Sequence, residues 1–250
     1  MDTLAKALIS RASGQSKLRV DDVVICEVDL AMIHDSGGPR RVKPILDRLQ
    51  RQVWDKDKIV VVTDHYVPAD NAETQAIQAL TKQWVQDQSI DKFYDEQGIC
   101  HVVLPERGHL APGLFCVGGD SHSPTGGAFG AYMFGIGATE MAGVLATGEI
   151  WIKVPETILM SWRNRLSAYV TAKDMMLAMC RKIGMGGGRY QAIQYAGQTI
   201  QALSMQERMT LSNMAAELGA QAGLIAPDEA TVAFVHAAGV RCLQIGAIFR

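Results

Sequence analysis

The sequence predicts an α/β protein in which helices cover a mainly parallel sheet. Short apolar runs typical of buried strands alternate with segments whose apolar residues recur every three to four positions, as on one face of a helix. The composition is that of a globular protein, with 48% apolar and 20% charged residues. A length of 250 residues suits two modest domains, which we expect over 1–165 and 166–250.

The first of these domains is expected to alternate helices with strands. The run 58–63 is the clearest strand because it is short, continuous and apolar, and Asn71 can cap the helix that follows it. Cys26 lies on a first strand. We expect helices at 3–12, 42–53, 71–85 and 138–147, and further strands at 99–104, 114–117 and 157–162.

The second domain shows two capping boxes, in which the side chains of the first residue and of the residue three positions later cap each other's backbone. Thr171 to Asp174 begins a Met-rich helix that Gly184 ends, and the glycines 186–188 form a loop. Ser204 to Glu207 begins a helix expected to run to Gly219. Pro227-Asp228-Glu229 begins a last helix.

The sequence argues against several classes of protein by its net charge, its cysteine spacing and its N-terminal residues. The formal net charge is −2, which argues against a nucleic-acid binder and against attraction to an anionic membrane. The five cysteines contain no CxxC pair, so neither a disulfide framework nor a zinc site is expected. The first residues carry no signal peptide, and no stretch reads as a membrane span. We therefore expect a cytoplasmic protein that binds neither nucleic acid nor membrane.

Histidines next to acids mark the ends of predicted strands. Asp64-His65 follows the strand 58–63, and Asp120-Ser121-His122 follows the strand 114–117. Because the carboxyl ends of parallel strands form the ligand crevice, this pattern indicates general acid–base chemistry. The alternative is that each histidine is a hydrogen-bonded structural residue. We expect one cleft to bring together six residues: Asp64, His65, His101, Asp120, Ser121 and His122.

Three further features leave their roles open. The stretch 118–143 holds eight glycines, which either approach an anion or allow tight packing, and it contains no nucleotide-binding motif. Asn213 and Glu217 share a helical face if the helix from Ser204 continues, and that face is either functional or solvated. The loop 34–39 either binds a ligand or only turns. His109 and His236 are expected to be structural or exposed.

Together these motifs resemble the large subunit of the aconitase superfamily, most closely its 3-isopropylmalate dehydratase branch. The likeness extends over about residues 1–235. The matching stretches are 28–35, 61–65, 98–101, 119–122, 126–130, 134–137, 154–157, 170–174, 195–197, 212–217 and 224–229.

The resemblance implies aconitase-like three-layer α/β/α domains and a hydro-lyase. Such an enzyme removes water from a hydroxy-dicarboxylate such as 3-isopropylmalate and adds it back, as in leucine biosynthesis. Carried over residue by residue, its catalytic acid–imidazole pairs are Asp64 with His65, Asp120 with His101, and Glu217 with His122. Ser121 and Asn213 would hold substrate or cluster. The family's [4Fe–4S] cluster supplies a Lewis acid for the leaving hydroxyl.

Two departures from the family follow from the sequence. None of the five cysteines matches a cluster ligand, so this chain is expected to bind no metal. The branch also uses a separate small subunit that provides a catalytic serine and a substrate-binding arginine. The chain is therefore expected to be a truncated large subunit, inactive when isolated, with an unmatched tail from about residue 235.

Other readings remain open at this stage. The chain could be a cluster-free, non-catalytic remnant, or it could resemble those relatives that bind RNA. The substrate could also be maleate, citraconate or dimethylmalate, because hydratases for these acids share the scaffold.

Overall fold

A computed structural model describes residues 3–240 of the chain. In chain order, the secondary-structure elements are α1 (Leu4–Ser13), β1 (Val23–Glu27), β2 (Leu30–His34), α2 (Pro39–Leu49), η1 (Lys56–Lys58), β3 (Ile59–Thr63), α3 (Ala72–Asp87), β4 (Phe93–Asp95), α4 (Cys100–Glu106), β5 (Phe115–Gly118), η2 (Ser123–Phe129), β6 (Tyr132–Gly135), α5 (Ala138–Thr147), β7 (Glu149–Lys153), β8 (Thr157–Ser161), α6 (Ala172–Ile183), β9 (Ala192–Ala196), α7 (Gln198–Ala202), α8 (Met205–Asn213), β10 (Ala222–Ile225) and α9 (Glu229–Ala237).

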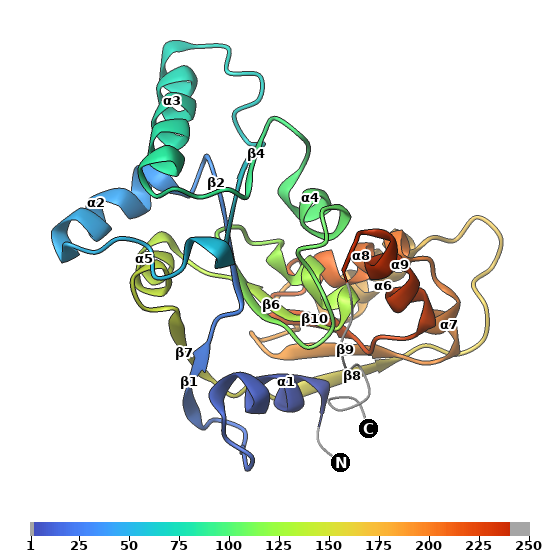
Figure 1. The fold of residues 1–250 in the computed structure, drawn as a ribbon. Helices are drawn as coiled ribbons and strands as arrows, with labels where there is room; N and C mark the ends of the chain where they lie inside the picture. Colours follow the sequence, from blue (N-terminus) through green and yellow to red (C-terminus); the bar gives the residue numbers. More distant parts are fainter. Residues whose placement is uncertain (1–2, 241–250) are drawn as a thin grey trace.

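A five-stranded parallel sheet in the order β4-β3-β2-β5-β6 forms the centre of the first half of the chain. Alternate residues of its strands belong to two cores, as the two-residue period of a strand requires. Ile33 and Val61 pack with α1, α2, α3 and α5, whereas Met32 and Val60 pack with α4, η2, α8 and α9. Helices thus cover both faces, which confirms the expected three-layer α/β/α architecture (Figure 1).

Two smaller sheets complete the described part. The strands β8, β9 and β10 form a parallel sheet in the order β10-β9-β8, and one of its faces packs on α6, α7 and α8. The strands β1 and β7 form an antiparallel pair. The division of the chain near residue 165 stays a prediction. No helix within residues 3–240 combines the length and apolar character that crossing a membrane requires.

The predicted helix caps are present. Asn71, Thr171 and Ser204 each accept a hydrogen bond from the backbone three residues ahead, and in each case the partner side chain returns to the cap. Asp228 caps α9 in the same way. Gly184 ends α6, as its position predicts.

Two sequence-based expectations about elements are wrong. The apolar run 99–104, expected as a strand, forms the short helix α4, so His101 lies on a helix. The helix from Ser204 ends at Asn213, and residues 214–219 form turns, so Asn213 and Glu217 do not share one helical face. The strands β4, β6, β7, β9 and β10 were not predicted.

Candidate active site

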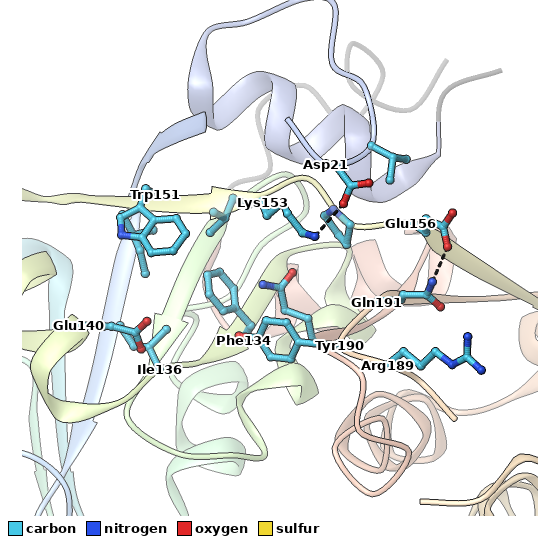
Figure 2. Close-up of a pocket in the computed structure, with 15 residues that line it drawn as sticks. Asp21, Phe134, Ile136, Glu140, Trp151, Lys153, Glu156, Arg189, Tyr190 and Gln191 are labelled. Atoms are coloured by element: carbon cyan, nitrogen blue, oxygen red, sulfur yellow. Dashed lines mark hydrogen bonds and ion pairs between the residues drawn. The ribbon is translucent and has the colours of Figure 1, made fainter. Parts of the chain in front are cut away.

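Of two large cavities, the larger lies away from the predicted site residues. It has a volume of about 720 Å³, and Trp151, Tyr190 and Arg189 contribute to its lining (Figure 2). An ion pair between Asp21 and Lys153, 2.7 Å between the charged atoms, stands at one side. None of the residues predicted to be catalytic or substrate-binding lines this cavity.

The second cavity, of about 560 Å³, is lined by three predicted site residues, His101, Asn213 and Glu217. Much of the remaining wall is apolar, including Val102 and Phe234. Of the predicted acids and imidazoles, Glu217 and His101 line this cavity, whereas Asp64, His65, Asp120 and His122 are not part of its wall.

The topology of the central sheet explains why these residues meet. Along the sheet, β3 lies on one side of β2 and β5 on the other, so the chain reverses direction across the sheet at β2. A crevice opens at the carboxyl ends of strands at such a switch point. His65 follows the end of β3, and Asp120 follows the end of β5.

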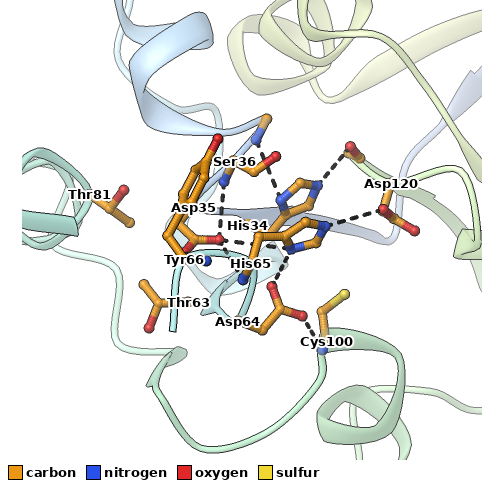
Figure 3. Close-up of polar contacts among 12 residues, drawn as sticks. His34, Asp35, Ser36, Thr63, Asp64, His65, Tyr66, Thr81, Cys100 and Asp120 are labelled. Carbon is orange, nitrogen blue, oxygen red and sulfur yellow. Dashed lines mark hydrogen bonds and ion pairs between the residues drawn. The ribbon is translucent and has the colours of Figure 1, made fainter. Parts of the chain in front are cut away.

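Asp64 and His65 form the first acid–imidazole pair. The ring Nδ1 of His65 donates to Asp64 Oδ1 at 2.6 Å, and Asp120 Oδ2 lies 3.6 Å from Nε2 (Figure 3). The interactions with Asp120 and then Asp64 raise the pKa of His65 to about 10, so its imidazole is charged at neutral pH.

Asp64 also positions α4. Its second oxygen accepts the backbone N–H of Cys100 at 2.7 Å, at the start of this helix. Burial opposes ionisation, but the hydrogen bonds from His65 and from the Cys100 backbone lower the pKa of Asp64 below its usual value. A carboxylate distant in sequence thus caps the helix that carries His101.

Asp120 joins the first pair to the second. Its Oδ1 accepts hydrogen bonds from His101 Nε2 at 2.7 Å and from the backbone N–H of His122 at 2.8 Å. Hydrogen bonds from His101 and then His65 hold the pKa of Asp120 well below its usual range. This carboxylate is therefore ionised and serves two imidazoles at once.

His122 and Glu217 form the third pair, with 3.0 Å between Nε2 and Oε1. The hydroxyl of Ser121 lies 3.2 Å from the other ring nitrogen of His122. Asn213 donates to the hydroxyl of Thr125 at 2.9 Å, which ties the end of α8 to η2. Glu217 Oε2 is buried and has no hydrogen-bond partner among the described residues.

Contacts connect all six residues expected to converge, and Glu217 joins them from the second half of the chain. Only His101 of the six lines the 560 Å³ cavity, so their place in one common cleft stays a prediction. The three expected acid–imidazole pairings are present as contacts. Their catalytic roles, and the substrate-binding roles of Ser121 and Asn213, stay predictions.

Two residues of this network were not predicted. His34 ends β2 and stacks on His65, with ring centroids 3.9 Å apart. Asp35 is fully buried and accepts backbone N–H groups of Ser36, His65 and Tyr66 at 3.0–3.1 Å. The available signal was the position of His34 at the end of an apolar strand, similar to that of His65 just after another.

The donor atoms of His34, Asp35, Asp64 and His65 lie within 4.8 Å of one another. Both oxygens of Asp35 already accept backbone N–H groups, and Asp64 already serves His65 and the Cys100 backbone. We therefore interpret this group as a hydrogen-bonded network and not as a metal centre.

The cysteines of the described part do not fit a cubane cluster, which needs three converging thiolates. Cys26, Cys100, Cys116 and Cys180 lie on β1, α4, β5 and α6, and no group of three comes together within residues 3–240. Burial raises the pKa of the Cys26 thiol to about 12 and also raises that of Cys116. Cys242 lies outside the described residues.

The chain is similar to known proteins of one family. A family profile described as "Aconitase family (aconitate hydratase)" matches residues 6–246, beyond the limit near 235 that we expected. A crystal structure of Thermococcus kodakaraensis aconitase X in its holo-form superposes with a TM-score of 0.47 at 10% identity, over 90% of this chain and 61% of that chain.

Curated relatives are closer in sequence. The probable 3-isopropylmalate dehydratase large subunit of Methanothermobacter thermautotrophicus is 43% identical over 235 residues, which cover 94% of this chain and 56% of the relative. The 3-isopropylmalate dehydratase large subunit 1 of Methanopyrus kandleri is 44% identical and covers 93% and 56%. A probable methanogen homoaconitase large subunit of M. thermautotrophicus is 38% identical and covers 94% and 56%. The chain spans about 56% of the length of these relatives, and with the family profile matching nearly all of it, the chain belongs to the aconitase family.

Proposed function

We propose that this chain forms the acid–imidazole part of a hydro-lyase active site of the 3-isopropylmalate dehydratase type. The observation that supports this most directly is the network in which Asp120 links His65, His101 and His122. Loss of water from a hydroxy acid needs a proton donor for the hydroxyl and a base for the carbon-bound proton. For the first of these tasks the network supplies hydrogen-bonded imidazoles, of which that of His65 is charged at neutral pH.

His65 is the group best suited to donate the proton. Its imidazole is charged at neutral pH, and two carboxylates orient both ring nitrogens. In the dehydration direction, the carbon–oxygen bond breaks while the imidazolium proton moves to the leaving hydroxyl and forms water. Asp64 and Asp120 stabilise the charge of the ring until the proton leaves.

The base that removes the carbon-bound proton is proposed to come from a small subunit. The curated relatives are named large subunits, which implies a partner of this kind for them. A cluster and that base are both needed for the overall reaction of the family. The isolated chain is therefore expected to take up no iron–sulfur cluster and to show no turnover.

The substrate is proposed to be a dicarboxylate with an alkyl substituent, of which 3-isopropylmalate is the leading example. Ile99, Val102 and Met209 give the 560 Å³ cavity an apolar wall, and Lys173 provides a cation for a carboxylate. One relative is a homoaconitase large subunit, so hydroxy-tricarboxylates belong in the same assay. Maleate, citraconate and dimethylmalate test the width of this selectivity. The cytoplasmic location stays a prediction.

A chimera tests the proposal. Residues 1–235 of this chain are joined to the remaining part of the M. thermautotrophicus relative, and the product is reconstituted anaerobically with iron, sulfide and the small subunit from that organism. Hydration of isopropylmaleate is followed by the loss of its double-bond absorbance. We expect turnover that His65→Gln lowers at least about 100-fold, whereas His109→Gln, which replaces a half-buried histidine away from the network, leaves it unchanged.

Two results would contradict the proposal. One is a folded chimera that carries the cluster but does not turn over any of the acids tested. The other is equal turnover by the His65→Gln and His109→Gln chimeras. The same assay on the isolated 250-residue chain provides the comparison that checks its expected inactivity.

A further inference from the structure

His34 is held in a single tautomer by hydrogen bonds at both ring nitrogens. Its Nε2 lies 2.9 Å from the carbonyl oxygen of Gly119, which can only accept, so Nε2 carries the proton. The backbone N–H of Gly37 then points to Nδ1 at 3.4 Å. The ring is 3% exposed, and burial together with the nearby His65 lowers the pKa of His34. The His34 imidazole is therefore neutral at physiological pH.

The ring of His34 also packs face to face against the ring of His65. Figure 3 shows the two imidazoles stacked. Their interplanar angle is 12° and their ring centroids are 3.9 Å apart. A neutral aromatic face against a cationic ring is an attractive arrangement of the cation–π type. The stack leaves the ring edges of His65 free to meet Asp64 and Asp120.

The surroundings leave His34 little freedom to move. A Cβ placed on Gly37 would lie 3.3 Å from His34 Cε1 and 3.3 Å from the Gly119 oxygen. Gly119 directly precedes Asp120, so the hydrogen bond from His34 also fixes the backbone that presents this carboxylate. His34 thus contacts His65 through its ring face and the residue that precedes Asp120 through its edge.

We propose that His34 is a positioning residue for His65. Its neutral ring stacks against the imidazolium of His65 and so sets the distance between that imidazolium and Asp120. The inference rests on the proposed function for its catalytic consequence, because His65 is the proton donor there. The groups that face His65 are His34 and Asp35 at the end of β2, Asp64 beside it after β3, and Asp120 after β5.

The test is a histidine NMR titration of the full 250-residue chain and its His34→Gln variant. A glutamine side chain keeps an N–H donor for the Gly119 carbonyl but removes the aromatic face. With ¹⁵N-labelled histidine, long-range ¹H–¹⁵N spectra report the protonation of each ring nitrogen. We expect the pKa of His65 to fall by about one unit in His34→Gln. A residue that only fills space would leave this pKa unchanged.

A matched variant and a measurement on the unchanged chain complete the design. His109→Gln removes another neutral histidine, which is half-buried and bonds Tyr94, and is expected to leave the His65 titration unchanged. In the unchanged chain His34 should show the Nε2–H tautomer from pH 6 to 8, with ring-to-ring cross-relaxation to His65.

Three outcomes would overturn the inference: an equal His65 pKa in the chain and in folded His34→Gln, an Nδ1–H tautomer of His34, or a protonated His34 at pH 7. The tautomer measurement decides the matter even if His34→Gln does not fold. None of these readouts uses turnover, so a failure of the chimera assay would contradict the proposed function without touching this result.

Discussion

Gly127 lies where η2 crosses the backbone of β10, and replacing it by alanine tests how closely these segments are packed. A Cβ on Gly127 would lie 1.9 Å from the carbonyl oxygen of Gly223 and 2.8 Å from its carbonyl carbon. Ordinary contacts between such atoms are about 3.5 Å, so the two segments must separate by roughly 1.5 Å. Both obstructing atoms belong to the backbone, and no side-chain rotation can relieve the overlap.

The expected cost follows from this geometry. Overpacking typically costs ~1–3 kcal/mol of stability. Because the obstructing atoms belong to the backbone, Gly127→Ala should lower the free energy of unfolding by about 3 kcal/mol. Gly143 lies within the helix α5, and a Cβ there meets no atom within 4 Å. Gly143→Ala should therefore stabilise the protein by about 0.5–1 kcal/mol, because alanine loses less backbone entropy than glycine. Two substitutions of the same kind in one glycine-rich stretch thus have opposite signs.

Urea unfolding followed by circular dichroism measures both free energies of unfolding. At about 2–4 °C per kcal/mol for a chain of this size, the melting temperature of Gly127→Ala should fall by about 6–12 °C. Because η2 begins after His122 and contacts Asn213 through Thr125, the variant should also disturb the site. A Gly127→Ala protein as stable as the unchanged chain would refute the close backbone contact.

Three other predictions concern charge. Asp228→Asn keeps an oxygen to cap α9 but leaves the fully buried Arg208 without its anion, so it should cost about 3 kcal/mol in urea unfolding, whereas Asp47→Asn in an exposed pair should cost under about 1 kcal/mol. The pKa of His65 is raised in the folded protein, so the charged imidazole stabilises the fold fully below about pH 6.5, and this contribution is lost as the pH rises towards 10. His65→Gln should remove this loss of stability at alkaline pH. Parallel curves of unfolding free energy against pH for the two proteins would contradict the prediction. The pKa of His109 is lowered to about 4 by burial and by the charges of Lys92 and Arg107, so the free energy of unfolding should decrease as the pH falls from 6.5 to 4. A His109→Gln chain that loses the same stability over this pH range would count against this.

Local signals in the sequence were sufficient for the elements with strong patterns. The strand β3 is a continuous apolar run, and the helices α3, α6 and α8 carry caps whose partners lie three residues away. In each of these cases the stabilising interactions are short-range, so one window of sequence contains them.

The helix α4 could not be predicted in this way because its N-terminus is stabilised from a distance. Ile99 offers no side-chain cap, and the carboxylate of Asp64, 36 positions earlier, accepts the N–H of Cys100 instead. The residues Val102 and Val103 are themselves typical of strands, so the local signal favoured the wrong element.

The candidate site was predicted in part. The acid–histidine motifs after predicted strands, Asp64-His65 and Asp120-Ser121-His122, indicated these residues without any knowledge of the fold. The contact between His122 and Glu217 joins residues 95 positions apart, and only the family resemblance identified it. His34 shared the strand-end position but had no spacing that distinguished it from a turn residue, so its stack on His65 needed the structure.

The central position of β2 has a consequence for synthesis of the chain on the ribosome. Both faces of β2 are apolar and buried in the finished sheet, and one of its edges pairs with β5. Phe115, where β5 begins, follows His34 by 81 positions (115 − 34), so at ~5–20 residues per second that edge stays open for about 4–16 s. Open apolar edges recruit other strands. Ribosome-bound chains arrested near residue 110 should therefore be bound by chaperones and cleaved readily by protease, whereas arrested chains long enough to expose β5 should resist both.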